Sequence, residues 1–196
     1  MARVAFIVAN DFEDSEFREP YERLRRAGHE VTVIGLEAGT PIQGKKGKEK
    51  LVSDTAIDRV SAGDFDALVI PGGYSPDHLR MDRRMVDFTR RFFDEGKTVA
   101  AVCHAPWMLV EADVVRDRTV TSWPSIRTDL ENAGARWVDQ EVVEDGPLIT
   151  SRKPADLPAF SAAILHRLDS EGARRRERPR EMPAGEGTSL SERPAI

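Results

Sequence analysis

A single cysteine followed directly by a histidine is the pair whose residue types point to covalent chemistry. Cys103 and His104 stand between the apolar run TVAAV, which predicts a buried strand, and APWMLVEA, which predicts a helix. A side chain at such a strand-to-helix turn projects above the sheet edge, where the helix dipole favours an anion. This geometry suits a thiolate at Cys103, whose pKa an adjacent imidazole lowers when the two side chains meet. A buried structural cysteine beside a surface histidine is the alternative.

Two glycines follow another predicted strand. Gly72 and Gly73 come directly after DALVI and Pro71. Paired glycines at a strand end allow a close backbone approach, so they are candidates for binding a substrate. The amides of Gly73 and His104 are a candidate pair for stabilising an oxyanion. A plain turn is the alternative.

An acidic loop follows the first predicted strand, RVAFIVA. It holds the run from Asn10 to Asp14. If this strand lies beside the strand that carries Cys103, one carboxylate of the loop is a candidate hydrogen-bond partner for the thiol. The alternative is an acidic helix start, a role that suits Glu13, Asp14 and Glu16.

Strand-like and helix-like segments alternate along the first 169 residues. β-Branched apolar runs predict strands, and apolar residues at helical spacing predict helices. Strands are expected at 3–9, 30–36, 66–70, 98–102, 137, 142–143 and 148–150, helices at 17–27, 83–95, 105–112, 125–133 and 156–168, and a small hairpin within 37–53. The alternation implies parallel strands joined by right-handed crossovers, hence an α/β fold built as a three-layer α/β/α sandwich. Ligands of such sheets bind at the carboxyl ends of the strands.

Composition excludes several classes of protein. The 196 residues are 40% apolar and carry a net charge of -5, which favours a water-soluble globular domain over a nucleic-acid binder. The apolar runs are too short for a membrane span. One cysteine and four scattered histidines leave no intrachain disulfide and no usual metal-ligand spacing, so we expect a cytoplasmic protein without a bound metal.

The composition changes near residue 170. Residues 170–196 are rich in arginine, glutamate, glycine and proline and hold few apolar side chains. Such a segment buries too little apolar surface to offset the entropy of ordering it. We therefore expect one domain over residues 1–169 and a flexible charged tail over 170–196.

Six segments, in order along the domain, resemble one known family. They are NDFEDSEF (10–17), RRAGHEVTVIG (25–35), FDALVIPGGYSPDHLR (65–80), VCHAPWMLVEADVVRDR (102–118), NAGARWVDQEVVEDG (132–146) and TSRKPADLPAF (150–160). Together they resemble the DJ-1/PfpI family of the class I glutamine-amidotransferase-like superfamily. The combination of FEDSEF, GKKGK and GGYSPD is most similar to its bacterial branch of general stress proteins and intracellular proteases.

The resemblance implies a flavodoxin-like sandwich and assigns roles to residues. Cys103 would be the nucleophile, His104 its neighbouring acid or base, and Glu13 the carboxylate hydrogen-bonded to the thiol. The amides of Gly73 and His104 would be the oxyanion donors. In the family's archaeal proteases a glutamate from another subunit orients the histidine, and Asp77 stands at the matching position, to act within the chain or from a partner.

The resemblance also implies an activity. The favoured hypothesis is a cofactor-independent cysteine hydrolase that acts in stress protection, as a glyoxalase or deglycase, on methylglyoxal, glyoxal or glycated proteins. The first alternative is an intracellular cysteine peptidase with the same residues. The second is a non-enzymatic protein, either a redox sensor whose Cys103 is oxidised or a chaperone. Family members of this branch assemble, so we expect a homo-oligomer of two or more subunits.

Overall fold

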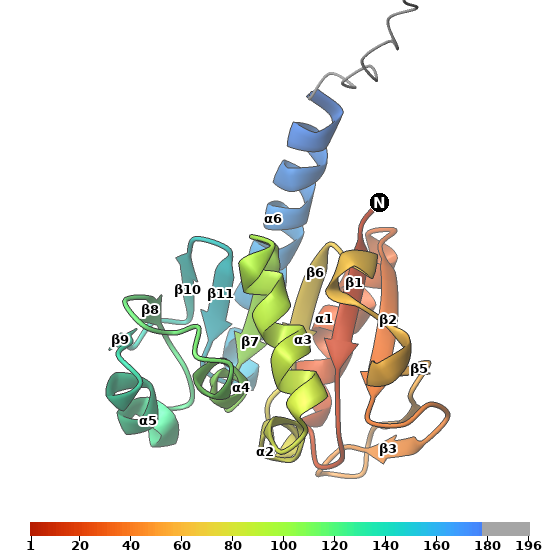
Figure 1. Ribbon diagram of the computed structural model, residues 1–196, viewed down its shortest axis with the longest axis horizontal. Coiled ribbons are helices and arrows are strands. Elements are labelled where there is room, and N and C mark those ends of the chain that lie inside the picture. The colour runs from red at the N-terminus through yellow and green to blue at the C-terminus, as the bar shows by residue number, and fades with distance from the viewer. Residues whose placement is uncertain (178–196) are drawn as a thin grey trace, which may run out of the picture.

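The computed structural model describes residues 1–177 and is built on a seven-stranded sheet (Figure 1). The strand order is β10-β11-β7-β6-β1-β2-β5. All neighbouring pairs are parallel except β10 with β11. The bounds are β1 (Arg3–Ile7), β2 (Glu30–Gly35), β5 (Thr55–Ala56), β6 (Ala67–Ile70), β7 (Thr98–Val102), β10 (Val142–Asp145) and β11 (Leu148–Ser151). The expected α/β fold with a mostly parallel sheet is confirmed.

Helices cover both faces of the sheet and complete the three layers. α1 (Asp14–Arg26) and α6 (Leu157–Glu177) pack on one face, and α2 (Ser75–Arg80), α3 (Arg83–Asp94), α4 (Pro106–Glu111) and α5 (Arg127–Asn132) lie on the other. Because the six parallel strands run in one direction, their carboxyl ends meet at one edge. In Figure 1 this is the lower edge, beside α2 and α4.

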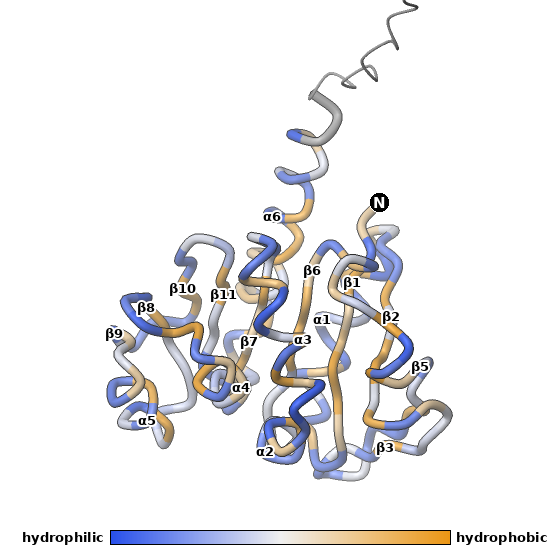
Figure 2. Tube along the Cα trace, viewed as in Figure 1, coloured by the Kyte–Doolittle hydropathy of each residue, from blue (hydrophilic) through white to orange (hydrophobic). Residues whose placement is uncertain are grey.

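The apolar run of the first strand divides between two cores. Ala5 and Ile7 belong to the cluster under α3 and α4, whereas Val4, Phe6 and Val8 belong to the cluster under α1 and α6. A strand alternates its side chains between the two faces, so one covered on both sides must be apolar throughout. Figure 2 shows this hydrophobic character along the central strands.

Smaller elements fill the long connections. The expected hairpin is present as β3 (Pro41–Gln43) and β4 (Lys50–Val52). The predicted helix 125–133 divides into a 3-10 turn, η3 (Pro124–Ile126), and α5, because Pro124 opens a tighter turn. α2 was not predicted from the sequence. β8 (Thr119–Val120) and β9 (Arg136–Trp137) form a separate parallel pair, and η1 (Ile57–Arg59), η2 (Ala62–Asp64) and η4 (Pro154–Asp156) are further 3-10 turns.

The last helix continues beyond the predicted domain boundary. The expected flexible tail began at residue 170, but α6 runs to Glu177, so residues 170–177 are helical. One side-chain bond explains part of this difference, because the hydroxyl of Thr98 donates to Glu171 Oε1 at 2.7 Å. The remainder of the predicted tail, 178–196, lies outside the described residues. Within residues 1–177 no helix is both long and apolar enough to cross a bilayer.

Candidate active site

Cys103 forms a sharp turn between β7 and α4. Its φ of 64° lies in the left-handed region, which costs a residue with a Cβ about 1–2 kcal/mol. Two backbone hydrogen bonds hold it there: its N–H donates to the carbonyl of Ser151 at 2.9 Å, and its carbonyl accepts the N–H of Trp123 at 2.9 Å. A strained backbone conformation that hydrogen bonds hold in place is typical of functional sites. The predicted strand-to-helix elbow is therefore present.

Two backbone N–H groups act on the sulfur of Cys103. They belong to Gly73 and His104, and both lower the pKa of the thiol. Gly73 has a φ of 75°, and a Cβ on it would lie 2.4 Å from the carbonyl oxygen of Asp11. Only glycine fits this position. The structure thus brings together the two amides that the sequence singled out, whereas the N–H of Gly72 points elsewhere.

Glu16, in the first turn of α1, is the carboxyl group beside the thiol. Its side chain is fully buried, and its Oε2 accepts the N–H of Gly72 at 3.0 Å. Its other oxygen, Oε1, is buried without a hydrogen-bond partner among the described residues, and the carboxyl group lies close enough to Cys103 for the two groups to shift each other's pKa. Burial raises the pKa of Glu16 to about 8, because a carboxylate removed from water loses its hydration. Glu16 therefore holds a proton at neutral pH.

Glu13 does not occupy the position expected of it. Its carboxylate pairs with Lys45 at 2.8 Å and with Lys46 at 2.5 Å. Burial raises the pKa of Glu13, but the hydrogen bonds and charges of the two lysines outweigh burial and hold that pKa below its usual value. β6 lies between β1 and β7, so the condition that these two strands be neighbours is not met. The segment after β1 reaches Cys103 through α1.

Opposing effects set the charge on the sulfur. Burial raises the pKa of Cys103, and the charge and hydrogen bond of Glu16 raise it further, while the amides of Gly73 and His104 lower it. At neutral pH Glu16 is protonated, so its charge no longer acts on the thiol. Cys103 and Glu16 titrate as a coupled pair, and because the pKa of each is raised, both groups hold their protons at neutral pH. A thiolate therefore forms when a neighbouring base takes the thiol proton, and the amides of Gly73 and His104 favour that charged form.

The imidazole of His104 has a partner at each nitrogen. Nδ1 lies 3.2 Å from the sulfur of Cys103, so these adjacent side chains do meet. Nε2 lies 3.2 Å from the hydroxyl of Ser125. Burial and then the positive charge of Lys45 lower the pKa of His104, because both disfavour an imidazolium. The ring is therefore neutral at physiological pH and able to accept a proton.

Asp77 does not reach His104 within one chain. It lies on the exposed side of α2, and its backbone N–H donates to the carbonyl of Tyr74 at 3.0 Å. Among the described residues its carboxylate has no hydrogen bond or ion pair with the imidazole, whose outer nitrogen faces Ser125 instead. The arrangement within the chain is therefore absent, and the alternative, in which Asp77 acts from a partner subunit, stays a prediction.

Sequence reasoning missed Glu16 and Ser125, and one signal was available for the first. Glu16 lies one turn before Pro20 and two turns before Leu24, which are both buried on α1. A carboxylate in phase with a helix's apolar face is expensive to bury, so it indicates a specific partner. No comparable signal marks Ser125, which is exposed and follows a proline in a connection.

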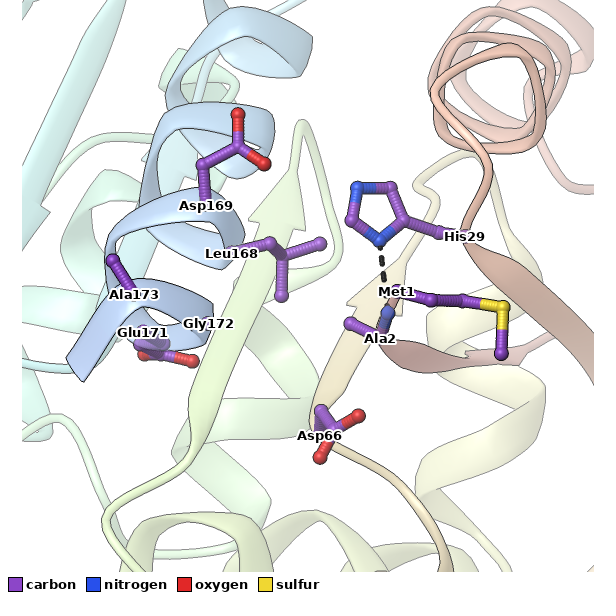
Figure 3. Close-up of a pocket in the computed structure, with 9 residues that line it drawn as sticks. All are labelled: Met1, Ala2, His29, Asp66, Leu168, Asp169, Glu171, Gly172 and Ala173. Carbon is purple, nitrogen blue, oxygen red and sulfur yellow. Dashed lines mark hydrogen bonds between the residues drawn. The ribbon is translucent and has the colours of Figure 1, made fainter. Parts of the chain in front are cut away.

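A different cavity, of about 330 Å³, lies at the opposite edge of the sheet, between the N-terminus and the end of α6 (Figure 3). Its lining residues are Met1, Ala2, His29, Asp66, Leu168, Asp169, Glu171, Gly172 and Ala173. His29 Nδ1 accepts the N–H of Ala2 at 3.2 Å, so this imidazole is used in holding the first strand. No thiol or hydroxyl lines the cavity, and we place the candidate site at Cys103.

Comparison with known proteins shows the family of this chain. The family model described as the DJ-1/PfpI family matches residues 2–167. The chain belongs to the DJ-1/PfpI family. This match covers every residue placed around Cys103 above and, apart from Leu168, the buried residues of both cores. It ends ten residues before α6 does.

Similar members of the DJ-1/PfpI family include bacterial proteins and a solved structure. Protein/nucleic acid deglycase 2 of Escherichia coli is 49% identical over 85% of this chain and 97% of that protein. General stress protein 18 of Bacillus subtilis is 47% identical over 85% of this chain and 98% of that protein. The crystal structure of Drosophila melanogaster DJ-1beta superposes with a TM-score of 0.77 at 34% identity, covering 83% of this chain and 87% of that one.

Proposed function

We propose that this chain is a cofactor-independent cysteine enzyme that acts as a glyoxalase or deglycase on methylglyoxal, glyoxal or their adducts. The observation that carries the proposal is the set of contacts on one sulfur: the amides of Gly73 and His104, the Glu16 carboxyl group and the His104 imidazole. They supply hydrogen-bond donors, an acid and a base around one nucleophile. The deglycase name of the E. coli relative supports this substrate class.

The first step forms a hemithioacetal. His104 takes the proton of the Cys103 thiol as the sulfur forms a C–S bond with the aldehyde carbon, and the carbonyl π electrons move to oxygen as an alkoxide. The N–H groups of Gly73 and His104 stabilise that charge, and the proton held by the His104 imidazole then neutralises it. An amine adduct reaches the same hemithioacetal when sulfur displaces nitrogen, because the C–N bond breaks and the amine leaves with a proton from His104.

The second step is an internal redox reaction. His104 removes the hydrogen of the first carbon as a proton and returns a proton to the second carbon, while a hydroxyl proton moves from the first oxygen to the second through Glu16. The first carbon is thereby oxidised to a thioester as the second is reduced to an alcohol. Water then breaks the C–S bond and releases lactate from methylglyoxal, or glycolate from glyoxal. No external oxidant or reductant is needed, in line with the cofactor-free proposal.

Peptide hydrolysis ranks second. The amine leaving group of a peptide needs a proton from a firmly oriented imidazole. Within the chain, Asp77 does not contact the imidazole of His104 and so does not orient it. Oxidation sensing by Cys103 ranks third, because the side chain is buried and burial raises the pKa of its thiol, which lowers its reactivity toward peroxide. A role as a holdase chaperone also ranks behind the two enzyme hypotheses, since it makes no use of this site.

Assembly is a separate part of the proposal. We infer a homo-oligomer of two or more subunits, in which a partner's exposed α2 approaches the site and brings its Asp77 with it. Light scattering coupled to size-exclusion chromatography measures this directly. A protein that remains monomeric at the concentration of the activity assay would remove any role for Asp77 from a partner.

The decisive experiment compares wild type with Cys103→Ala in amine-free phosphate buffer. We expect wild type to convert methylglyoxal into a matching amount of lactate, and the variant to form none while keeping its circular dichroism spectrum. Preformed adducts of methylglyoxal with N-acetyl-lysine are then followed for release of free amine. Undiminished lactate formation by Cys103→Ala would overturn the mechanism. Casein cleavage that depends on Cys103, without lactate, would favour the peptidase instead.

A further inference from the structure

His104 is held from outside the elbow by one side chain, that of Ser125. The hydroxyl oxygen lies 3.2 Å from Nε2, and the sulfur of Cys103 lies 3.2 Å from Nδ1 on the other side of the ring. The three groups form one line of hydrogen bonds from the nucleophile to the protein surface. Neither step of the proposed reaction uses Ser125.

The position of Ser125 is fixed by the elbow itself. The N–H of Trp123 donates to the carbonyl of Cys103 at 2.9 Å. Pro124 then begins the 3-10 turn η3, which the N–H of Ile126 closes on the carbonyl of Trp123 at 3.3 Å. Ser125 lies between these two hydrogen bonds in the chain, and they fix its hydroxyl relative to the turn that contains Cys103.

A second contact to the imidazole comes from Trp107 in α4, whose own side chain is held by α5. The ring of Trp107 lies 5.2 Å from the ring of His104, at an interplanar angle of 58°. The indole N–H of Trp107 donates to Asp129 in α5 at 2.8 Å. The segment from η3 to α5 thus touches His104 directly through Ser125 and indirectly through Trp107. These contacts hold the imidazole ring of His104 in place.

We propose that Ser125 is a positioning residue for His104, and that its hydroxyl supports the imidazole in both of its neutral tautomers. This inference rests on the proposed function and deepens it. A hydroxyl donates to Nε2 when Nδ1 carries the hydrogen, and accepts from Nε2 when Nδ1 is free. His104 can therefore face the sulfur as a donor before the reaction and as an acceptor during proton transfer, without turning its ring.

A carboxylate in this place would behave differently. It accepts hydrogen bonds and donates none, so it would fix the hydrogen on Nε2 and stabilise an imidazolium. The charged and titratable groups around the ring are Cys103, Lys45 and, behind Trp107, Asp129 and Arg80. A neutral hydroxyl adds no charge to this set of groups, which agrees with the lowered pKa of His104.

The test compares Ser125→Ala, Ser125→Thr and Ser125→Asp with wild type, and Ser170→Ala is the matched control. Ser170 is on α6 and donates only to the carbonyl of His166. For Ser125→Ala we expect kcat for methylglyoxal to fall about tenfold with KM within about twofold, because only the orientation of the base is lost. Ser125→Thr should restore most of kcat. Ser125→Asp should move the acidic limb of the kcat profile upward by about one pH unit.

Two readouts do not depend on turnover. Nitrogen-15 chemical shifts of His104 report its tautomer, and the pH dependence of Cys103 alkylation by iodoacetamide reports its contact with the sulfur. In Ser125→Ala we expect the tautomer populations to change and Ser125→Thr to restore them. Unchanged shifts and kcat in Ser125→Ala, or equal losses in the Thr and Ala variants, would overturn the proposal. If wild type makes no lactate, the proposed function fails while these two readouts still decide the role of Ser125.

Discussion

The backbone N–H of Gly72 donates to Oε2 of Glu16 at 3.0 Å. A Cβ on this glycine would lie 2.5 Å from that oxygen and 2.7 Å from the Cβ of Cys103. We therefore predict that Gly72→Ala pushes the acid away from the thiol. Lactate formation should fall by about tenfold or more, and the free energy of unfolding by about 1–3 kcal/mol.

Gly172→Ala is the control for that substitution. Gly172 lies within α6, and a Cβ on it would have no neighbour within 4 Å. Alanine is the better helix former, so stability should stay equal or rise by at most about 1 kcal/mol. Kinetics and urea unfolding measure both variants. Equal behaviour of the two alanine variants would show that Gly72 is not pressed between Glu16 and Cys103.

Glu16 should make the protein less stable as pH rises. Its pKa is about 8 in the folded protein against an ordinary value of 4.5 in the unfolded chain, so between these values the folded protein holds a proton that the unfolded chain has released. Stability from this group is complete below pH 4.5 and is lost as pH rises toward 8, by at most about 5 kcal/mol. Urea unfolding at several pH values should show this slope in wild type and not in Glu16→Gln.

Glu22→Gln is the matched control, because Glu22 lies on the same helix but is only half-buried and pairs with Arg26. Its unfolding profile should follow that of wild type. Parallel profiles of wild type and Glu16→Gln would contradict a buried protonated carboxyl group at this site.

Glu13 and Glu16 should differ in their effects on the thiol. Glu16→Gln removes the acid that moves a proton between the substrate oxygens in the proposed reaction, so lactate formation should fall by about 100-fold or more. Glu13→Gln removes a partner of Lys45 and Lys46, which loosens the loop after β3, and turnover should fall by less than about tenfold. Iodoacetamide alkylation of Cys103 across pH, run on both variants, measures the same difference directly. A larger effect of Glu13→Gln would make Glu13, and not Glu16, the acid that serves the thiol.

Asp77→Asn should keep at least about half of wild-type turnover when the protein is monomeric, because Ser125 rather than Asp77 faces His104. Steady-state kinetics at two protein concentrations, beside light scattering, measure the effect. A loss of tenfold that appears only in an assembled state would instead show that a partner subunit's carboxylate acts at the site.

The architecture followed from the sequence because the strands are short apolar runs separated by helical periodicity. Elements with weak patterns did not: α2 has six residues, and β8 and β9 have two each. The elbow at Cys103 and the amides of Gly73 and His104 were predictable because each follows a strand. The role of Glu13 was inferred from the family resemblance. Nothing in the sequence alone showed that Glu16, three residues further on in the first turn of α1, is the carboxyl group beside the thiol.

The boundary at residue 170 was predicted from composition alone. Thr98 shows why that was insufficient, since a single buried hydroxyl on β7 engages Glu171 and belongs to the environment of α6. Long-range bonds of this kind leave no periodic signal in the sequence. The same holds for Ser125, whose contact with His104 depends on a connection between separate elements.

The far end of α6 has a practical consequence. It stands at the edge of the sheet where β1 begins, whereas β7, which leads into Cys103, ends at the other edge (Figure 1). A resin, a fluorophore or a second protein coupled to the last turns of this helix would lie at the edge of the sheet opposite the candidate active site. Immobilised preparations attached there should leave the approach of small aldehydes to the thiol unobstructed.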